Sequence, residues 1–176
     1  MGSVGGDSVG NGISRICNDA LISHFALLIF HSCIPSAKYI EDKTFTFCGT
    51  PNYLPPEIIM NRGHGLSADN WSLGVLIYEM TEGENPFYYD GMDQMALFQA
   101  ICQENYYALP DDTSKATRDL IDRLLQKDPT QRLGTMREQE ILSHAYFSDV
   151  DFPLLRKKKV VAPWIPDPFS LSADDE

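Results

Sequence analysis

The stretch DNWSLGVLIYEM, from Asp69 to Met80, decides the fold that the sequence predicts. Apolar residues occupy almost every position of this stretch, so a helix formed by it has no polar face. A helix of that kind is normally buried on all sides. We therefore predict that Asp69–Met80 is the central helix of the core, with Asp69 placed to cap it.

Shorter helices are expected on both sides of this central helix. The patterns of apolar residues and helix-breaking residues predict them over 55–63, 92–102, 114–127 and 138–146. Ser114 is expected to cap the third of these helices, and Asp93 to lie in the first turn of the second. Asn85-Pro86-Phe87 is expected to form a turn, and prolines from Pro153 onward predict an extended tail. Because no segment alternates like a strand, the predicted fold class is mainly α.

Composition excludes several classes of function. The 176 residues carry 14 Lys and Arg against 25 Asp and Glu, a formal net charge of −11. Such a chain repels phosphate backbones, so nucleic-acid binding is disfavoured and a basic partner is favoured. The four cysteines lie far apart without a C-x-x-C pair, which excludes a zinc finger or disulfide scaffold and indicates an intracellular protein.

The first 36 residues differ in character from the rest. Residues 1–12 are rich in Gly and Ser but lack the spacing of a phosphate-binding loop. The apolar run Ala20–Ile34 is too short to span a bilayer, and Asp19 at its edge argues against a signal peptide. His24 and His31 share a helical face without a third metal ligand nearby. We therefore expect a cytoplasmic protein without membrane attachment, and secretion is the weaker alternative.

Several motifs occur together in the rest of the chain. They are TFCGTPNYLPPE at 46–57, SADNWSLG at 67–74, Pro86-Phe87 and Arg132-Leu133-Gly134. In this order they resemble the second half of a protein kinase domain. The tail APWIP at 162–166 is similar to the AGC group, and the wording of the first two motifs is most similar to cyclic-nucleotide-dependent kinases.

The resemblance implies three regions and a fold. Residues 1–36 match nothing in the family, 37–155 resemble the C-terminal lobe of a kinase from the activation loop onward, and 156–176 resemble a truncated AGC tail. The implied fold is the mainly α large lobe of the kinase-like fold, in incomplete form.

The resemblance also implies roles in binding a substrate. It assigns substrate binding to Phe47, Thr50, Pro51, Leu54 and Glu79. Thr50 matches a threonine that contacts the catalytic aspartate, and Glu79 matches a carboxylate that recognises an arginine shortly before the phosphoacceptor. Thr46 matches the phosphorylation site of the activation loop. The alternatives are an ordinary loop threonine for Thr46 and a solvated carboxylate for Glu79.

Four other residues match structural positions of the family. Glu57 and Arg132 match a carboxylate and a guanidinium that form a buried pair beneath the substrate loop. Trp71 matches a structural position of the central helix. Asp69 matches the residue that anchors the catalytic loop, although a plain helix cap is the alternative role.

The departures from the family concern catalysis. A kinase requires a Gly-rich loop, a strand lysine, an H-R-D loop and a D-F-G aspartate, and the sequence contains none of them. Cys33-Ile34-Pro35-Ser36 stand where D-F-G is expected, which suggests a truncated or mis-joined gene product. Asn52 replaces a family glutamate, and Pro55 replaces the alanine of A-P-E. ATP and magnesium are therefore implied by the resemblance alone, without a catalytic, cofactor or metal site in this chain.

Two functions remain open from the sequence. The first is a Ser/Thr protein kinase that transfers the γ-phosphate of ATP to basic peptides, of which this chain is a part that is inactive alone. The second is a non-catalytic module that binds basic peptides or a regulatory subunit. A cyclic-nucleotide-binding regulatory domain or subunit is a further partner that the resemblance allows.

Overall fold

The computed structural model describes residues 43–47 and 49–162, and these residues are mainly helical. Their elements are η2 (Pro51–Tyr53), α2 (Pro56–Ile59), α3 (Ser67–Glu82), α4 (Gln94–Gln103), α5 (Lys115–Leu124), α6 (Gln139–Leu142), η3 (Ala145–Phe147) and α7 (Phe152–Arg156). The strand-like pairing within this part of the chain is a single antiparallel bridge between Thr44 and His64. The predicted mainly α fold class is confirmed.

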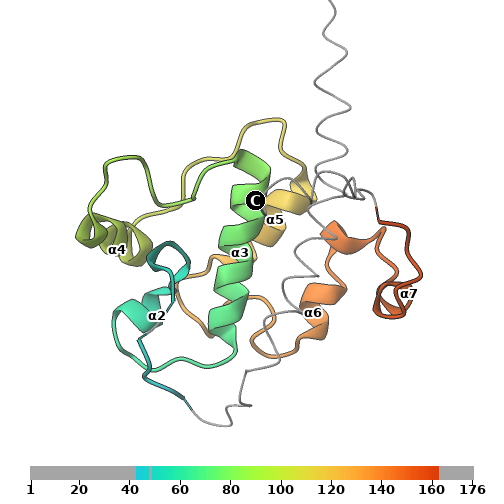
Figure 1. The fold of residues 1–176 in the computed structure, drawn as a ribbon, viewed down its shortest axis with the longest axis horizontal. Helices are drawn as coiled ribbons and strands as arrows, with labels where there is room; N and C mark the ends of the chain where they lie inside the picture. The colour runs from blue at the N-terminus through green and yellow to red at the C-terminus, as the bar shows by residue number, and fades with distance from the viewer. Residues whose placement is uncertain (1–42, 48, 163–176) are drawn as a thin grey trace, which may run out of the picture.

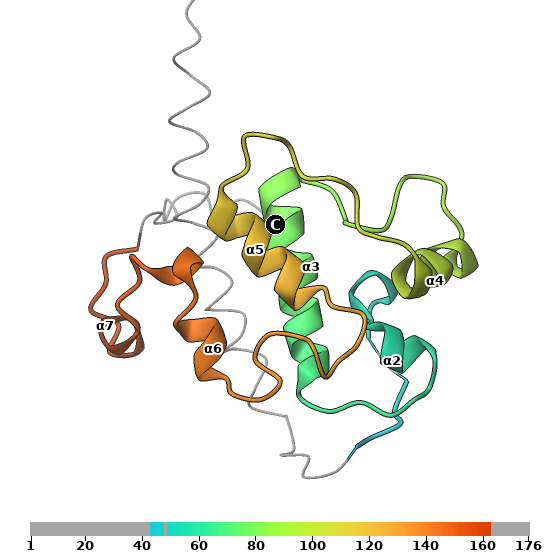
Figure 2. The ribbon, with the colours of Figure 1, turned by 180° about the vertical axis from the view of Figure 1, so that it is seen from behind.

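Helix α3 runs through the middle of the fold (Figure 1). Helices α2 and α4 lie on one side of it, α6 and α7 lie on the other, and α5 packs along it, as the view from behind shows (Figure 2). Trp71 and Val75 share one face of α3, Leu73 and Ile77 lie away from it, and all four are buried, whereas Leu76 and Met80 are partly exposed. The predicted central position of this helix is confirmed, but its burial on all sides is not complete.

The close packing of α3 against α5 depends on Gly74. A Cβ atom at this position would lie only 2.8 Å from the Cβ of Leu124 and 2.9 Å from Cδ2 of Leu125. Helix α5 offers a single apolar face to this contact, which includes the fully buried Leu120 and Ile121. The backbone of α3 therefore approaches α5 more closely than any side chain at Gly74 would permit.

The helix caps confirm one prediction and correct two. Ser114 caps α5, because its hydroxyl accepts a hydrogen bond of 3.0 Å from the N–H of Thr117. Asp69 does not cap α3: the helix begins two residues earlier, at Ser67, and Asp69 lies exposed in its first turn. Asp93 caps α4 instead of lying within its first turn, because its carboxylate accepts from the N–H of Ala96 at 2.9 Å.

Several predicted segments have different bounds in the structure, and the helix expected over 114–127 is α5, which ends at Leu124. The helix expected over 55–63 ends at Ile59, since Asn61 takes a left-handed backbone conformation with φ of 52°. The helix expected over 138–146 is two short helices, α6 and η3. The tail expected to be extended contains α7, which Asp151 caps by accepting from the N–H of Leu154 at 2.9 Å.

Two predictions concern residues that the structure does not describe. The N-terminal region 1–36, with its apolar run Ala20–Ile34, lies outside the described residues, and so does most of the AGC-like tail beyond residue 162. Within 43–47 and 49–162, no helix has both the length and the apolar character needed to cross a bilayer.

Candidate functional site: a peptide-binding surface

The segment before α2 presents an exposed threonine. The backbone bridge between Thr44 and His64, with N···O distances of 3.0 and 2.9 Å, ties this segment to the loop that precedes α3. Two residues further on, the Thr46 side chain is exposed, and its hydroxyl lies 3.2 Å from the hydroxyl of Thr44. The residue expected to be phosphorylated is therefore open to solvent on a segment anchored at Thr44.

Two of the three residues expected to form an apolar pocket lie near Phe98 of α4. The ring of Phe47 is 58% exposed and stands edge-on to Phe98, with ring centres 6.2 Å apart. Leu54 is 4% exposed and belongs to a small apolar cluster against which Phe98 also packs. Pro51 begins η2 and is half-buried. The structure thus brings Phe47 and Leu54 to the same aromatic side chain of a helix that lies far along the sequence.

Thr50 lies exposed at the start of η2. Its carbonyl accepts a hydrogen bond of 3.0 Å from the N–H of Tyr53, which closes the turn. Its side chain makes no capping hydrogen bond to η2. The Thr50 hydroxyl is therefore not used to hold this helix.

Glu79 in α3 has hydrogen-bond donors on both of its carboxylate oxygens. The Tyr53 hydroxyl donates to Oε2, and the Nδ2 group of Asn85 donates to Oε1 at 2.8 Å. Glu79 is half-buried. Burial and the hydrogen bond to Glu79 raise the pKa of Tyr53 to about 12, so this hydroxyl remains a donor at neutral pH. Glu79 is held in one orientation while it keeps its negative charge.

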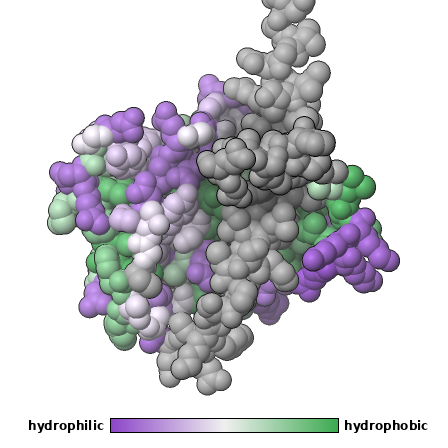
Figure 3. Space-filling view, viewed as in Figure 1, coloured by the Kyte–Doolittle hydropathy of each residue, from purple (hydrophilic) through white to green (hydrophobic). Residues whose placement is uncertain are grey.

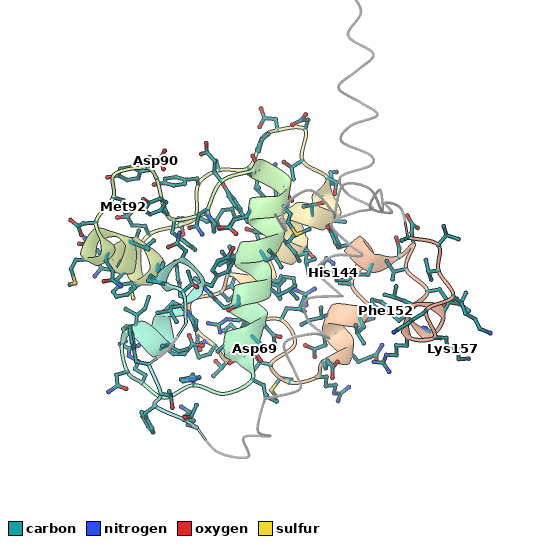
Figure 4. All side chains as sticks on the ribbon, in the orientation of Figure 1. Asp69, Asp90, Met92, His144, Phe152 and Lys157 are labelled. Carbon is teal, nitrogen blue, oxygen red and sulfur yellow. The ribbon has the colours of Figure 1, made fainter. Side chains whose placement is uncertain are left out.

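Further acidic residues surround the end of α3 near Glu79. Burial, together with the charges of Glu82 and Glu84, raises the pKa of Tyr78 to about 12. Asp90 lies in the loop that follows α3, at the opposite end of the helix from Asp69 (Figure 4). Glu82 and Glu84 thus place further carboxylates beside Tyr78, which precedes Glu79 in α3.

Glu57 and Arg132 meet in the interior, although 75 residues separate them in the sequence. Both are buried, with 3% and 2% of their surface exposed. Nη1 of Arg132 donates to Oε1 of Glu57 at 2.8 Å, and Nη2 donates to Oε2 at 3.0 Å. The guanidinium also donates to the carbonyls of Ser67 at 2.6 Å and Gln126 at 3.1 Å. This two-pronged geometry satisfies both charges and joins α2 to the loop after α5.

Trp71 forms the centre of an aromatic and cationic stack. Its ring lies parallel to that of Phe87, with centres 5.6 Å apart and planes 8° apart. The ammonium of Lys127 lies 4.0 Å from the centre of the Phe87 ring, and the guanidinium carbon of Arg132 lies 5.3 Å from that of Trp71. Burial lowers the pKa of Lys127 to about 8. The structure therefore gives Trp71 packing contacts in the core.

A magnesium site was not found among the described residues. Magnesium requires oxygen ligands held close together, and residues 43–47 and 49–162 contain no group of three His, Cys, Asp or Glu side chains that could hold a metal ion. Asp69, expected to anchor a catalytic loop, is exposed near the start of α3 (Figure 4).

Sequence reasoning missed three contributors to this surface. The sequence assigns no role to Tyr53 within the motif TFCGTPNYLPPE, predicts only a turn at Asn85, and predicts only a helix around Phe98. The signal for Asn85 was present, because an Asn before Pro-Phe favours a turn in which its side chain accepts from the backbone two residues on. The hydrogen bond from the Asn85 NH2 group to Glu79 could not be predicted in this way, because it depends on how the chain folds back after α3.

The surface around α2 and α4 also carries exposed apolar side chains. In the space-filling view, apolar atoms lie among polar ones on the side of these helices (Figure 3). Large apolar residues that are exposed on these segments are Phe45, Phe47, Met60 and Met95.

Comparison with known proteins places these features in a family. Residues 35–147 match the model of the protein kinase domain. The chain is 42% identical over 132 residues to the cAMP-dependent protein kinase catalytic subunit of Dictyostelium discoideum. This alignment covers 74% of this chain and 20% of that protein. It is 40% identical over 144 residues to serine/threonine-protein kinase gad8 of Schizosaccharomyces pombe, covering 81% and 24% of the two chains.

A mammalian protein kinase has a similar level of identity to the chain. The chain is 40% identical over 144 residues to the cAMP-dependent protein kinase catalytic subunit PRKX of Mus musculus, covering 80% of this chain and 38% of that protein. The chain thus spans between a fifth and two fifths of the length of these relatives. They are Ser/Thr kinases of the AGC group, the group that the motifs resemble. This chain belongs to the protein kinase family, within its AGC group.

Proposed function

We propose that this chain is the peptide-binding part of an AGC-type Ser/Thr protein kinase that acts on basic peptides in the cytoplasm. Glu79 recognises an arginine shortly before the phosphoacceptor. Phe47, Pro51 and Leu54 receive the apolar residue that follows it. Thr50 contacts the catalytic machinery at the acceptor hydroxyl.

The arrangement of the Glu79 carboxylate carries this proposal. Each carboxylate oxygen has two acceptor sites, and Tyr53 and Asn85 occupy one site on each oxygen. Both donors are neutral, so the charge of Glu79 is not compensated by them. One acceptor site on each oxygen remains for a ligand, which matches the two parallel N–H groups of a guanidinium.

The proposal also covers regulation of the loop before α2. Phosphorylation of the exposed Thr46 adds nearly two negative charges, which order a loop when basic side chains are near. We assign Thr46 as the phosphorylation site of this segment. The nearest basic residue in the chain that the structure describes is Lys43, three positions earlier.

Phosphoryl transfer needs groups that these 176 residues do not supply. The sequence has no H-R-D or D-F-G motif, so we infer that this polypeptide alone does not transfer phosphate. A second candidate function follows, a non-catalytic module that binds a basic peptide or a cyclic-nucleotide-binding regulatory domain. The exposed Phe45, Phe47 and Met60 favour it, because a protein partner would bury them.

Peptide binding tests the proposal directly. Fluorescence anisotropy of the full chain with a labelled serine peptide carrying one arginine should show binding that weakens at least about tenfold when citrulline replaces the arginine, since one charge-assisted pair is lost. Glu79→Gln should remove this difference. A control variant, Asp112→Asn, changes the net charge equally on a loop between α4 and α5 and should retain it. Equal binding of both peptides to the unsubstituted chain would refute the proposal.

A further inference from the structure

Asn85 fixes the orientation of its own amide group. Its Oδ1 atom accepts a hydrogen bond of 3.0 Å from the N–H of Phe87. A backbone N–H can only donate, so the amide oxygen must face Phe87 and the NH2 group must face Glu79. The next residue, Pro86, restricts the backbone of Asn85 to extended conformations. Asn85 is also buried, with 7% of its surface exposed, which removes alternative rotamers.

The Asn85 amide in turn acts on the Glu79 carboxylate. Nδ2 of Asn85 lies 2.8 Å from Oε1, while the Tyr53 hydroxyl binds Oε2. With a donor on each oxygen, the plane of the carboxylate cannot rotate about its terminal bond without breaking a hydrogen bond. A single donor, on Oε2 alone, would restrict that rotation less, because the Tyr53 hydroxyl can follow one moving oxygen and the torsion itself has broad minima.

We propose that Asn85 is a positioning residue that makes Glu79 selective for arginine over lysine. This inference rests on the proposed function of Glu79. A guanidinium is planar and offers two parallel N–H groups, so it gains from a carboxylate whose plane is fixed. An ammonium is a point charge that binds one oxygen from any direction, so it gains nothing from that restriction.

The test compares two variants at Asn85 that differ in what they retain. Asn85→Ser keeps a side-chain oxygen that can accept from the N–H of Phe87, but it is too short to reach Glu79. Asn85→Asp keeps the shape and the acceptor of the turn, and it replaces the donor to Glu79 by a charge of the same sign. Gln126→Ala is the matched control, because it removes an amide that donates to the carbonyl of Asp122 in α5 at 2.7 Å.

The readout is a ratio of affinities. Anisotropy is measured for the full chain with two serine peptides that differ only in arginine or lysine shortly before the serine. In Asn85→Ser and in Asn85→Asp we expect the preference for the arginine peptide over the lysine peptide to fall about tenfold. This factor corresponds to the loss of one hydrogen bond to a charged group, taken at the weak end of its range. The affinity for the lysine peptide should change by less than about twofold in Asn85→Ser, because the ammonium does not use the fixed plane.

The outcomes separate the two claims. An arginine preference that survives Glu79→Gln refutes the proposed function. A preference lost in Glu79→Gln but intact in Asn85→Ser refutes the role of Asn85 alone. Equal weakening of both peptides, with a lower melting temperature, shows that Asn85 only supports the turn and also overturns the inference. If Asn85→Ser does not fold, the same ratio measured on Asn85→Asp decides, since that variant keeps the turn.

Discussion

Replacing Arg132 by alanine should destabilise the fold severely, because it leaves the Glu57 carboxylate buried without its partner. Only 3% of the Glu57 surface reaches solvent, and the two hydrogen bonds to it, of 2.8 and 3.0 Å, both come from Arg132. Breaking a buried ion pair from one side costs about 3–5 kcal/mol. That is a large share of the 5–15 kcal/mol, roughly, by which a domain of this size is stable.

The loss extends beyond the ion pair. The Arg132 side chain also satisfies the carbonyls of Ser67 and Gln126, at 2.6 and 3.1 Å. Its guanidinium lies 5.3 Å from the centre of the Trp71 ring, so alanine also opens a cavity beside the core. We therefore expect the upper half of the range, about 4–5 kcal/mol, in the free energy of unfolding.

Urea denaturation of the full chain, followed by far-ultraviolet circular dichroism, measures this loss. Arg132→Lys keeps the charge but not the two-pronged geometry and should recover only part of the stability. The pair Glu57→Gln with Arg132→Met removes both charges and should be more stable than Arg132→Ala, because no charge is left stranded. A double-mutant cycle over these variants isolates the coupling between the two side chains.

Two results would refute this reasoning. A loss below about 1 kcal/mol in Arg132→Ala would mean that water reaches Glu57 and replaces its partner. Additive effects of Glu57→Gln and Arg132→Met would mean that the two side chains do not act as a unit.

Two further substitutions probe the core and its titration. Gly74→Ala should cost about 1–3 kcal/mol in chemical denaturation, because the new Cβ would lie 2.8 Å from that of Leu124, whereas Gly65→Ala meets no atom within 4 Å and should be near neutral. The pKa of Lys127 is lowered to about 8 by burial, so the unfolded chain binds more protons between about pH 8 and 10.5. The free energy of unfolding should therefore rise over this window by about 1–2 kcal/mol relative to Lys127→Met, a value reduced for the partial exposure of the side chain. Equal dependence of stability on pH in both proteins would contradict the burial of the Lys127 ammonium.

The central helix could be predicted from the sequence because its evidence is local. A run of apolar residues on every side requires burial, and most of α3 is buried, although the side that carries Asp69, Leu76 and Met80 is partly exposed. Its start was misplaced by two residues because Asp69 looks like a cap, while Leu66, at the true cap position, makes no side-chain hydrogen bond. Similarly, the turn at Asn85-Pro86-Phe87 could be predicted from its residues, and the Oδ1 contact to Phe87 is what such a turn provides.

Contacts between distant residues could not be predicted from periodicity. The pairing of Glu57 with Arg132 was expected only through a resemblance, since nothing in either helix pattern points to a residue 75 positions away. The contact between Phe47 and Phe98 had no signal at all, because an aromatic residue on α4 is equally compatible with the core. Tertiary packing decides such contacts, and the residue pattern of a single segment does not indicate how that segment packs against distant ones.

Glu57 and Glu79 show how the same residue type takes opposite roles through its donors. Glu57 receives both of its hydrogen bonds from a cationic guanidinium and is buried, so its charge is neutralised and no ligand reaches it. Glu79 receives both of its hydrogen bonds from neutral groups and is half-exposed, so it stays an uncompensated anion with acceptor sites free. Glu57 follows two prolines and Glu79 follows an apolar stretch. Neither of these local sequences indicates whether the donors to the glutamate are charged or neutral. The distinction between the structural carboxylate of Glu57 and the recognising one that we propose for Glu79 is therefore made by their donors, Arg132 for the first and Tyr53 and Asn85 for the second.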